Sequence, residues 1–125
     1  MALGVAVALG LAVAGVLSTD SGQVTLPSAV ERIVPVAGSL ITPQGDVGAD
    51  LADDLTGLLI IDGDEVPLDQ LTRVEPLGQV FFSPGPGQYL RAFEPGTHSV
   101  TVVYWERTKT QADASSFTWQ FRVGS

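Results

Sequence analysis

The sequence contains no cysteine and no asparagine, and its only histidine is His98. Without cysteine there is no disulfide framework, thiolate metal site, cysteine nucleophile or lipidated-cysteine anchor. Without asparagine there is no acceptor for N-glycosylation. The function classes that depend on these residues are therefore excluded.

Basic residues are also scarce, since one lysine and five arginines stand against fourteen acidic residues and leave a net charge of −8. The excess is local, because no Lys or Arg interrupts residues 46–69 and the remaining acids and bases balance. The acids of this block are Asp46, Asp50, Asp53, Asp54, Asp62, Asp64, Glu65 and Asp69. We expect a solvated acidic face, which repels nucleic acid and anionic lipid. Calcium binding by "DGDE" at 62–65, helped by Asp53 and Asp54, is the alternative, although the spacing of a calcium loop is missing.

Residues 2–17 form an apolar run with no charge before Asp20. A spanning helix needs about 20 residues, whereas the apolar core of a signal peptide usually has about 7–15. We predict a single-span membrane anchor over residues 1–20, with the following domain outside the cell membrane. A secreted protein cleaved before Thr19 and a buried helix are the alternatives. No basic residue precedes Arg32, and a true start upstream of Met1 would explain that gap.

After a linker over residues 21–30, the rest of the chain, 31–125, reads as one domain of short β-type runs separated by turns. We expect extended segments at 24–26, 32–38, 46–53, 56–61 and 79–83, with the two longest strands at 97–106 and 115–123. Pro35 has no N–H to donate to a neighbouring strand, so we expect its segment at the edge of a sheet. Asp62-Gly63 predicts a hairpin. A short helix over 49–55 competes with the strand there, and residues 68–78 are expected to be irregular.

The last strand shows the clearest pattern. Phe117, Trp119, Phe121 and Val123 alternate with polar residues, which indicates one buried and one wet face. About seven such strands in about 100 residues predict an all-β fold, an antiparallel immunoglobulin-like sandwich.

The order of "IDG", "FFSP", "FEPGTHSVTV" and "FTWQFRV" resembles bacterial immunoglobulin-like and fibronectin-III-like domains of exported proteins. The matching residues are Pro95, Gly96, His98, Val100 and Val102, then Trp119, Phe121 and Val123. The resemblance covers roughly residues 30–123 and implies a sandwich without implying a ligand. Similar sandwiches of the periplasmic copper-carrier type bind copper through several histidines, so that function is not carried over to a chain with one. The composition suggests an actinobacterial source.

His98 stands at the start of a strand with Val100, Val102 and Tyr104 on its face, and with Ser99, Thr101, Val103 and Trp105 on the other. A catalytic triad needs its nucleophile and base to converge, and Ser99 points away from His98. We therefore favour a structural role for His98 over a catalytic or ligand-binding one. We assign no catalytic, cofactor or metal residue. Trp105 and Trp119 are expected in the core, but an exposed Trp105 would mark a contact surface.

These observations predict a non-enzymatic, membrane-anchored extracytoplasmic domain that binds or scaffolds another protein of the bacterial envelope. Its expected contact elements are the loop at residues 107–114 and the acidic face. The alternative is an accessory subunit of an integral membrane complex, whose N-terminal helix packs against partner helices through Gly4, Gly10 and Gly15. We expect no small-molecule ligand.

Overall fold

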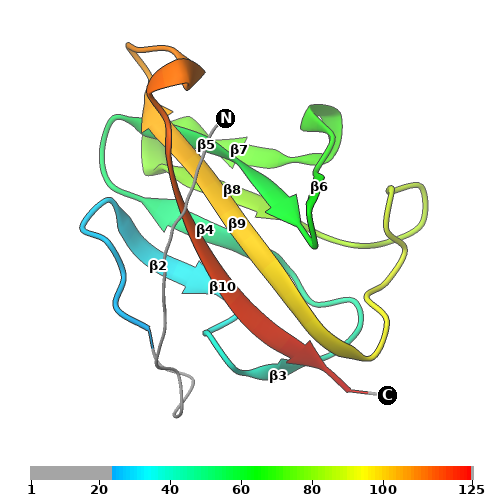
Figure 1. Ribbon diagram of the computed structural model, residues 1–125. Helices are drawn as coiled ribbons and strands as arrows, with labels where there is room; N and C mark the ends of the chain where they lie inside the picture. The colour runs from blue at the N-terminus through cyan, green and yellow to red at the C-terminus, as the bar shows by residue number, and fades with distance from the viewer. Residues whose placement is uncertain (1–23, 125) are drawn as a thin grey trace.

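The computed structural model describes residues 24–124, which fold into two β-sheets packed face to face (Figure 1). One sheet has five strands in the order β3-β10-β9-β5-β6, and the other has four in the order β2-β4-β8-β7. The strands are β2 (Val30–Val34), β3 (Leu40–Ile41), β4 (Val47–Leu51), β5 (Leu55–Ile61), β6 (Asp64–Glu65), β7 (Thr72–Val74), β8 (Gln79–Phe82), β9 (Gly96–Glu106) and β10 (Ser115–Val123). The prediction of an all-β sandwich is confirmed.

The long hairpin of β9 and β10 organises the five-stranded sheet. The two strands pair from Ser115↔Tyr104 to Val123↔Gly96 without a register shift. Trp119, Phe121 and Val123 are buried, while the polar residues between them are exposed. The alternation seen in the sequence therefore predicts the buried face of β10 correctly, and Trp119 lies in the core as expected.

The core lies between the sheets and receives apolar side chains from both. β9 and β10 contribute Val100, Val102 and Phe121, and the four-stranded sheet contributes Val47 and Phe82, all with exposed fractions of 0%. Burial of each such side chain stabilises the fold by roughly 1.5–3 kcal/mol relative to exposure. The core therefore holds the two sheets together without a disulfide.

Residues 47–63 contain the strand and the hairpin turn that the sequence predicts there. Residues 47–51 form a strand, so the competing helix over 49–55 is wrong. Gly48 is required there, because a Cβ atom would lie 2.1 Å from Phe81 Cδ1 and 2.3 Å from the Val80 carbonyl oxygen. Asp62 and Gly63 both have positive φ, at 51° and 87°, as the tight turn between β5 and β6 demands.

Three features differ from the sequence predictions. β3 pairs in parallel with β10, so the sandwich is not purely antiparallel. Residues 72–74, expected to be irregular, form the edge strand β7 between the short 3₁₀ turns η2 (Leu68–Gln70) and η3 (Glu75–Leu77). Residues 24–26 form no strand. Strands of two or three residues are too short to show an alternating pattern, which is why β3 and β7 were missed.

The expected N-terminal anchor over residues 1–20 lies outside the described residues. Within residues 24–124 no helix is long and apolar enough to cross a membrane. The division into anchor, linker and domain stays a prediction.

Candidate functional site

His98 lies on the core-facing side of β9, at the border between the core and solvent. Its ring lies between Phe93 and Phe121, with centroid distances of 5.2 and 5.6 Å. Its Nδ1 lies 2.6 Å from Asp62 Oδ2, and its Nε2 lies 2.6 Å from the carbonyl oxygen of Glu94. The imidazole therefore ties the turn after β5 to the loop before β9.

Both partners of the His98 ring are acceptors, so only the imidazolium can donate to both at once. Burial, the largest single influence, lowers the pKa of His98, because it penalises the charged form. The hydrogen bonds to Asp62 and Glu94, together with the negative charges of these residues, outweigh it, and the pKa of His98 is raised. Protonation of His98 therefore strengthens this clamp between Asp62 and Glu94.

Asp62 follows the last residue of β5 and continues the hydrogen bonding to β9. Its N–H donates to the carbonyl oxygen of Ser99 at 3.0 Å, and its Oδ1 accepts from the N–H of Ser99 at 2.9 Å. The side chain of Ser99 lies on the opposite face of β9 from His98, as expected. Asp62, His98 and Ser99 are thus neighbours, but the Ser99 hydroxyl is not placed as a nucleophile.

Tyr89 lies near this clamp and packs its ring against Phe82 at a centroid distance of 5.1 Å. Burial, reinforced by the negative charges of Asp64 and Asp62, raises the pKa of Tyr89 to about 12. The phenol is therefore neutral at physiological pH and is no general base there.

The acidic block does not gather into one site. Asp50 pairs with Arg32, Asp54 with Arg107 and Asp62 with His98. Asp46 precedes β4, whereas Asp54 lies in the turn between β4 and β5, and Asp46 accepts a hydrogen bond from Ser83. Among residues 24–124, no group of three or more His, Asp or Glu side chains is placed to hold a metal ion. The calcium alternative gains no support from this geometry.

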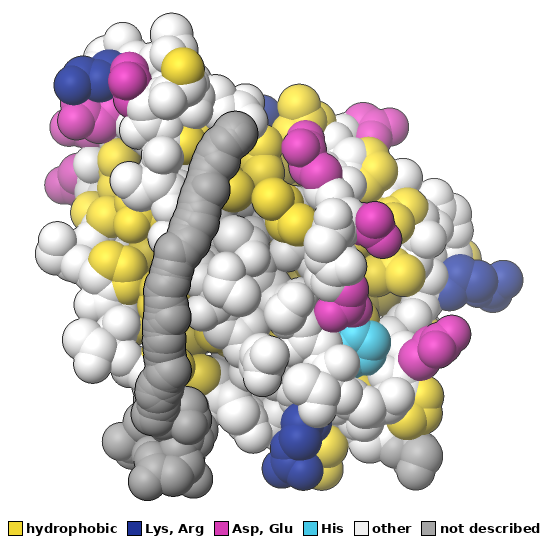
Figure 2. Space-filling view, in the orientation of Figure 1, with side chains coloured by type: hydrophobic (Ala, Val, Ile, Leu, Met, Phe, Trp, Pro, Cys, Tyr) yellow, Lys and Arg dark blue, Asp and Glu magenta, His cyan; other side chains and the backbone are white. Residues whose placement is uncertain are grey.

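The outward face of the five-stranded sheet carries apolar side chains that do not belong to the core. Leu58 pairs with Val103, Thr56 with Trp105 and Ile60 with Thr101 across β5 and β9. We call Ile60, Val103 and Trp105, which are all half-buried, the outer patch. Leu58 lies on the same face but is only 3% exposed and is not counted in the patch. Hydrophobic side chains reach the surface on this face (Figure 2). Trp105 therefore faces away from the core, contrary to our expectation.

The loop at residues 107–114 joins β9 to β10 and contains one 3₁₀ turn, η4 (Gln111–Asp113). Arg107 fixes its base, since its guanidinium donates to Asp54 Oδ1 at 3.2 Å and to the carbonyl oxygen of Glu75 at 3.1 Å. Residues 108–113 are exposed. The start of the loop is therefore held by the contacts of Arg107, and the rest of the loop extends into solvent at one end of the sandwich.

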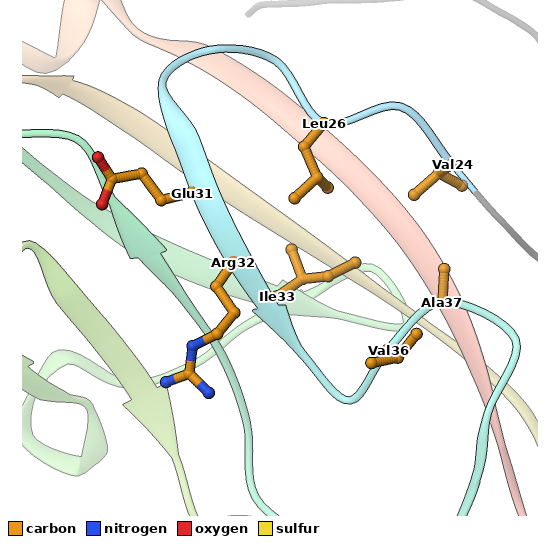
Figure 3. A pocket seen from close by; sticks show the side chains of 7 residues that line it. All are labelled: Val24, Leu26, Glu31, Arg32, Ile33, Val36 and Ala37. Atoms are coloured by element: carbon orange, nitrogen blue, oxygen red, sulfur yellow. The ribbon is translucent and has the colours of Figure 1, made fainter.

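A shallow groove lies beside β2, the edge strand of the four-stranded sheet. It has a volume of about 310 Å³ and is lined by Val24, Leu26, Glu31, Arg32, Ile33, Val36 and Ala37. Figure 3 shows Val24 and Leu26 on one side of the groove and Val36 and Ala37 on the other. Its lining offers mainly apolar contacts and one residue of each charge.

No protein-family model and no curated protein matches this chain. Among solved structures, the chain is similar to CopC from Methylosinus trichosporium OB3b, with a TM-score of 0.56 and 10% identity. That likeness covers 78% of this chain and 94% of CopC. A second similar structure is PcoC, a copper resistance protein from Escherichia coli, with a TM-score of 0.49 and 12% identity, and this likeness covers 75% of this chain and 97% of PcoC. The likeness to CopC shows a shared sandwich fold.

The soft ligands that copper(I) prefers are missing from the described residues. Copper(I) favours thiolate and thioether groups, and copper(II) also takes imidazole and other nitrogen and oxygen donors. Both nitrogens of the only histidine already contact oxygen atoms, there is no cysteine, and the only methionine is Met1. The described residues therefore offer no thiolate or thioether, and their one imidazole is already engaged by Asp62 and Glu94.

Proposed function

We propose that this protein is a non-enzymatic, membrane-anchored extracytoplasmic domain that binds or scaffolds another envelope protein. The observation that carries this proposal is the outer patch. A two-layer sandwich buries the inner faces of its sheets, and the half-buried Ile60, Val103 and Trp105 are apolar on the opposite face of one of them. Contiguous apolar side chains on an outer face are typical of contact surfaces.

Trp105 is the expected centre of the interface. Tryptophan contributes more contact area than any other side chain and is enriched among residues that dominate binding energy. Trp105 is the last residue but one of β9, and the braced loop at residues 107–114 follows directly. The patch and the loop therefore form one continuous contact region, which agrees with the loop being a contact element.

The absence of a built reaction centre also favours a binding role. Within the described residues, His98 is occupied by Asp62 and Glu94, and the phenol of Tyr89 is held neutral. The anchor itself is proposed from the apolar run at residues 2–17. An accessory subunit of an integral membrane complex is the second candidate, because the small glycine and alanine residues of the same run would permit close contact between helices.

The experiment is purification of the full chain from native membranes in mild detergent, beside Trp105→Ala and the control Arg73→Ala. Arg73 is exposed on β7 of the other sheet. We expect a partner to co-purify with the wild type and the control but not with Trp105→Ala. If Trp105→Ala retains the partner, the partner does not bind through Trp105. That result would favour the accessory-subunit role, in which residues 2–17 make the contact. A monomer without any partner would contradict both.

A further inference from the structure

Exposed large apolar side chains gather at the end of the sandwich where the described chain begins. Val24, Val36 and Leu40 are 43%, 69% and 61% exposed. Val24 and Val36 line the same groove, and Leu40 follows Val36 through a turn closed by a 3.0 Å hydrogen bond from Ser39 N–H to the Val36 carbonyl oxygen. We call these three residues the apolar rim. They form a continuous feature and are not scattered single residues.

The rim and the loop at residues 107–114 lie at opposite ends of β10. Leu40 pairs with Arg122, next to the last residue of that strand, while the loop ends where the strand begins. A strand of nine residues spans roughly 30 Å. Figure 1 shows β3 at one end of the sandwich and the turn between β9 and β10 at the other. A surface that contacts the rim therefore leaves the loop free.

The length of chain between the apolar run and the rim is short. Val24 is seven residues beyond Leu17, the last residue of the run. Seven residues reach at most about 25 Å when fully extended. If residues 2–17 lie in a bilayer, Val24 must stay within that distance of the bilayer surface. The domain cannot then turn its opposite end, some 30 Å away, toward the membrane while its rim points away.

Arginine near the rim also suits a membrane surface. Arg122 is exposed beside Leu40. Arg32 lines the groove with a side chain that is 58% exposed and pairs with Asp50, and Glu31 lines the groove beside it. Asp53 and Asp54 lie at the far end, where Asp54 contacts Arg107. Arginine beside exposed aliphatic side chains is favourable at the interface between lipid head groups and water.

We propose that Val24, Val36 and Leu40 rest in the head-group region of the bilayer that holds the N-terminal anchor. This inference rests on the membrane anchoring in the proposed function. It fixes the orientation of the domain, because the rim contacts lipid and the loop at residues 107–114 points away from the membrane toward a partner. The groove beside β2 opens toward the lipid in this orientation.

The absence of cysteine allows a direct test with single-cysteine variants of the full chain. Val36→Cys, Leu40→Cys and the control Thr110→Cys each carry an environment-sensitive fluorophore at an exposed position. The labelled chains are reconstituted in phosphatidylcholine vesicles that contain a lipid-borne quencher. Unchanged melting temperatures establish that the three variants are folded.

We expect a blue shift and strong quenching at positions 36 and 40, and neither at position 110. Vesicle flotation of the chain with unquenched labels at 36 and 40 would overturn the inference while leaving the anchor intact. Quenching at position 110 alone would overturn it in favour of the opposite orientation. A chain that does not float with the vesicles would contradict the anchoring itself, so the two failures are distinguishable.

Discussion

The two faces of β9 have the same backbone and neighbouring strands but different tasks. On the inward face Val100 and Val102 are fully buried, and His98 is held by Asp62 and Glu94. On the outward face Val103 and Trp105 are half-buried and lie outside the core. One strand therefore supplies both the stability of this fold and, in our proposal, its contact surface.

The largest difference is expected on β10, which continues both faces. Phe121→Ala removes a fully buried ring from the inward face and should lower the free energy of unfolding by about 3–5 kcal/mol. Thr118→Ala changes an exposed outward residue, removes its hydrogen bond with Thr101, and should cost about 0.5–1.5 kcal/mol. Urea denaturation measures both. Equal costs would contradict the division.

A matched pair on β9 itself gives a smaller effect. Val102→Ala and Val103→Ala remove the same atoms from adjacent residues of the strand. We expect Val102→Ala to cost about 2 kcal/mol because it leaves a cavity in the core, and Val103→Ala to cost about half of that or less. Thermal and urea unfolding should give the same order. A larger cost for Val103→Ala than for Val102→Ala would mean that side chains on the outward face contribute more to stability than those in the core.

The His98 clamp should make stability depend on pH. Its pKa is raised in the folded chain, so its stabilising contribution is fully present below the unfolded value of 6.5 and is lost as pH rises through the folded pKa. His98→Gln should remove this pH dependence and cost about 1–2 kcal/mol at pH 5.5. Urea midpoints across pH 5–9 measure it. A wild-type profile that the substitution leaves unchanged would assign the dependence to another group.

A small effect on stability is expected for Trp105→Ala. Because Trp105 is half-buried and outside the core, we expect a cost of about 1 kcal/mol or less. The same change should abolish partner co-purification, whereas Arg73→Ala should leave it intact. A variant that unfolds, as judged by circular dichroism, would instead show that Trp105 stabilises the fold.

The sequence predicts the sandwich because its long strands alternate cleanly. Residues 115–123 reveal their buried face through Phe121 and Val123, and Asp62-Gly63 marks its hairpin through the φ values that the turn needs. β3 could not be foreseen, since two residues carry no period and a parallel pairing leaves no local signal. The placement of Trp105 was missed because its neighbours Thr101 and Val103 do not tell which face of a strand is covered.

The candidate site was harder to predict than the fold. The structural interpretation of His98 followed from its position on the strand, but its partners Asp62 and Glu94 come from separate segments that only the folded chain brings together. The acidic block looked like one face in the sequence. In the structure its members contact Arg32, Arg107 and His98 on different strands and turns, because adjacent turns of a sandwich lie at opposite ends.

Site-directed photo-crosslinking in native membranes tests the central claim most directly. A photoreactive amino acid replaces Trp105 on the outward face in one variant of the full chain and Arg73 on the other sheet in a second. We predict a covalent adduct with one envelope protein from position 105 and none from position 73. Adducts from both positions alike, or from position 73 only, would contradict the assignment of the outward face of β9 as the contact surface.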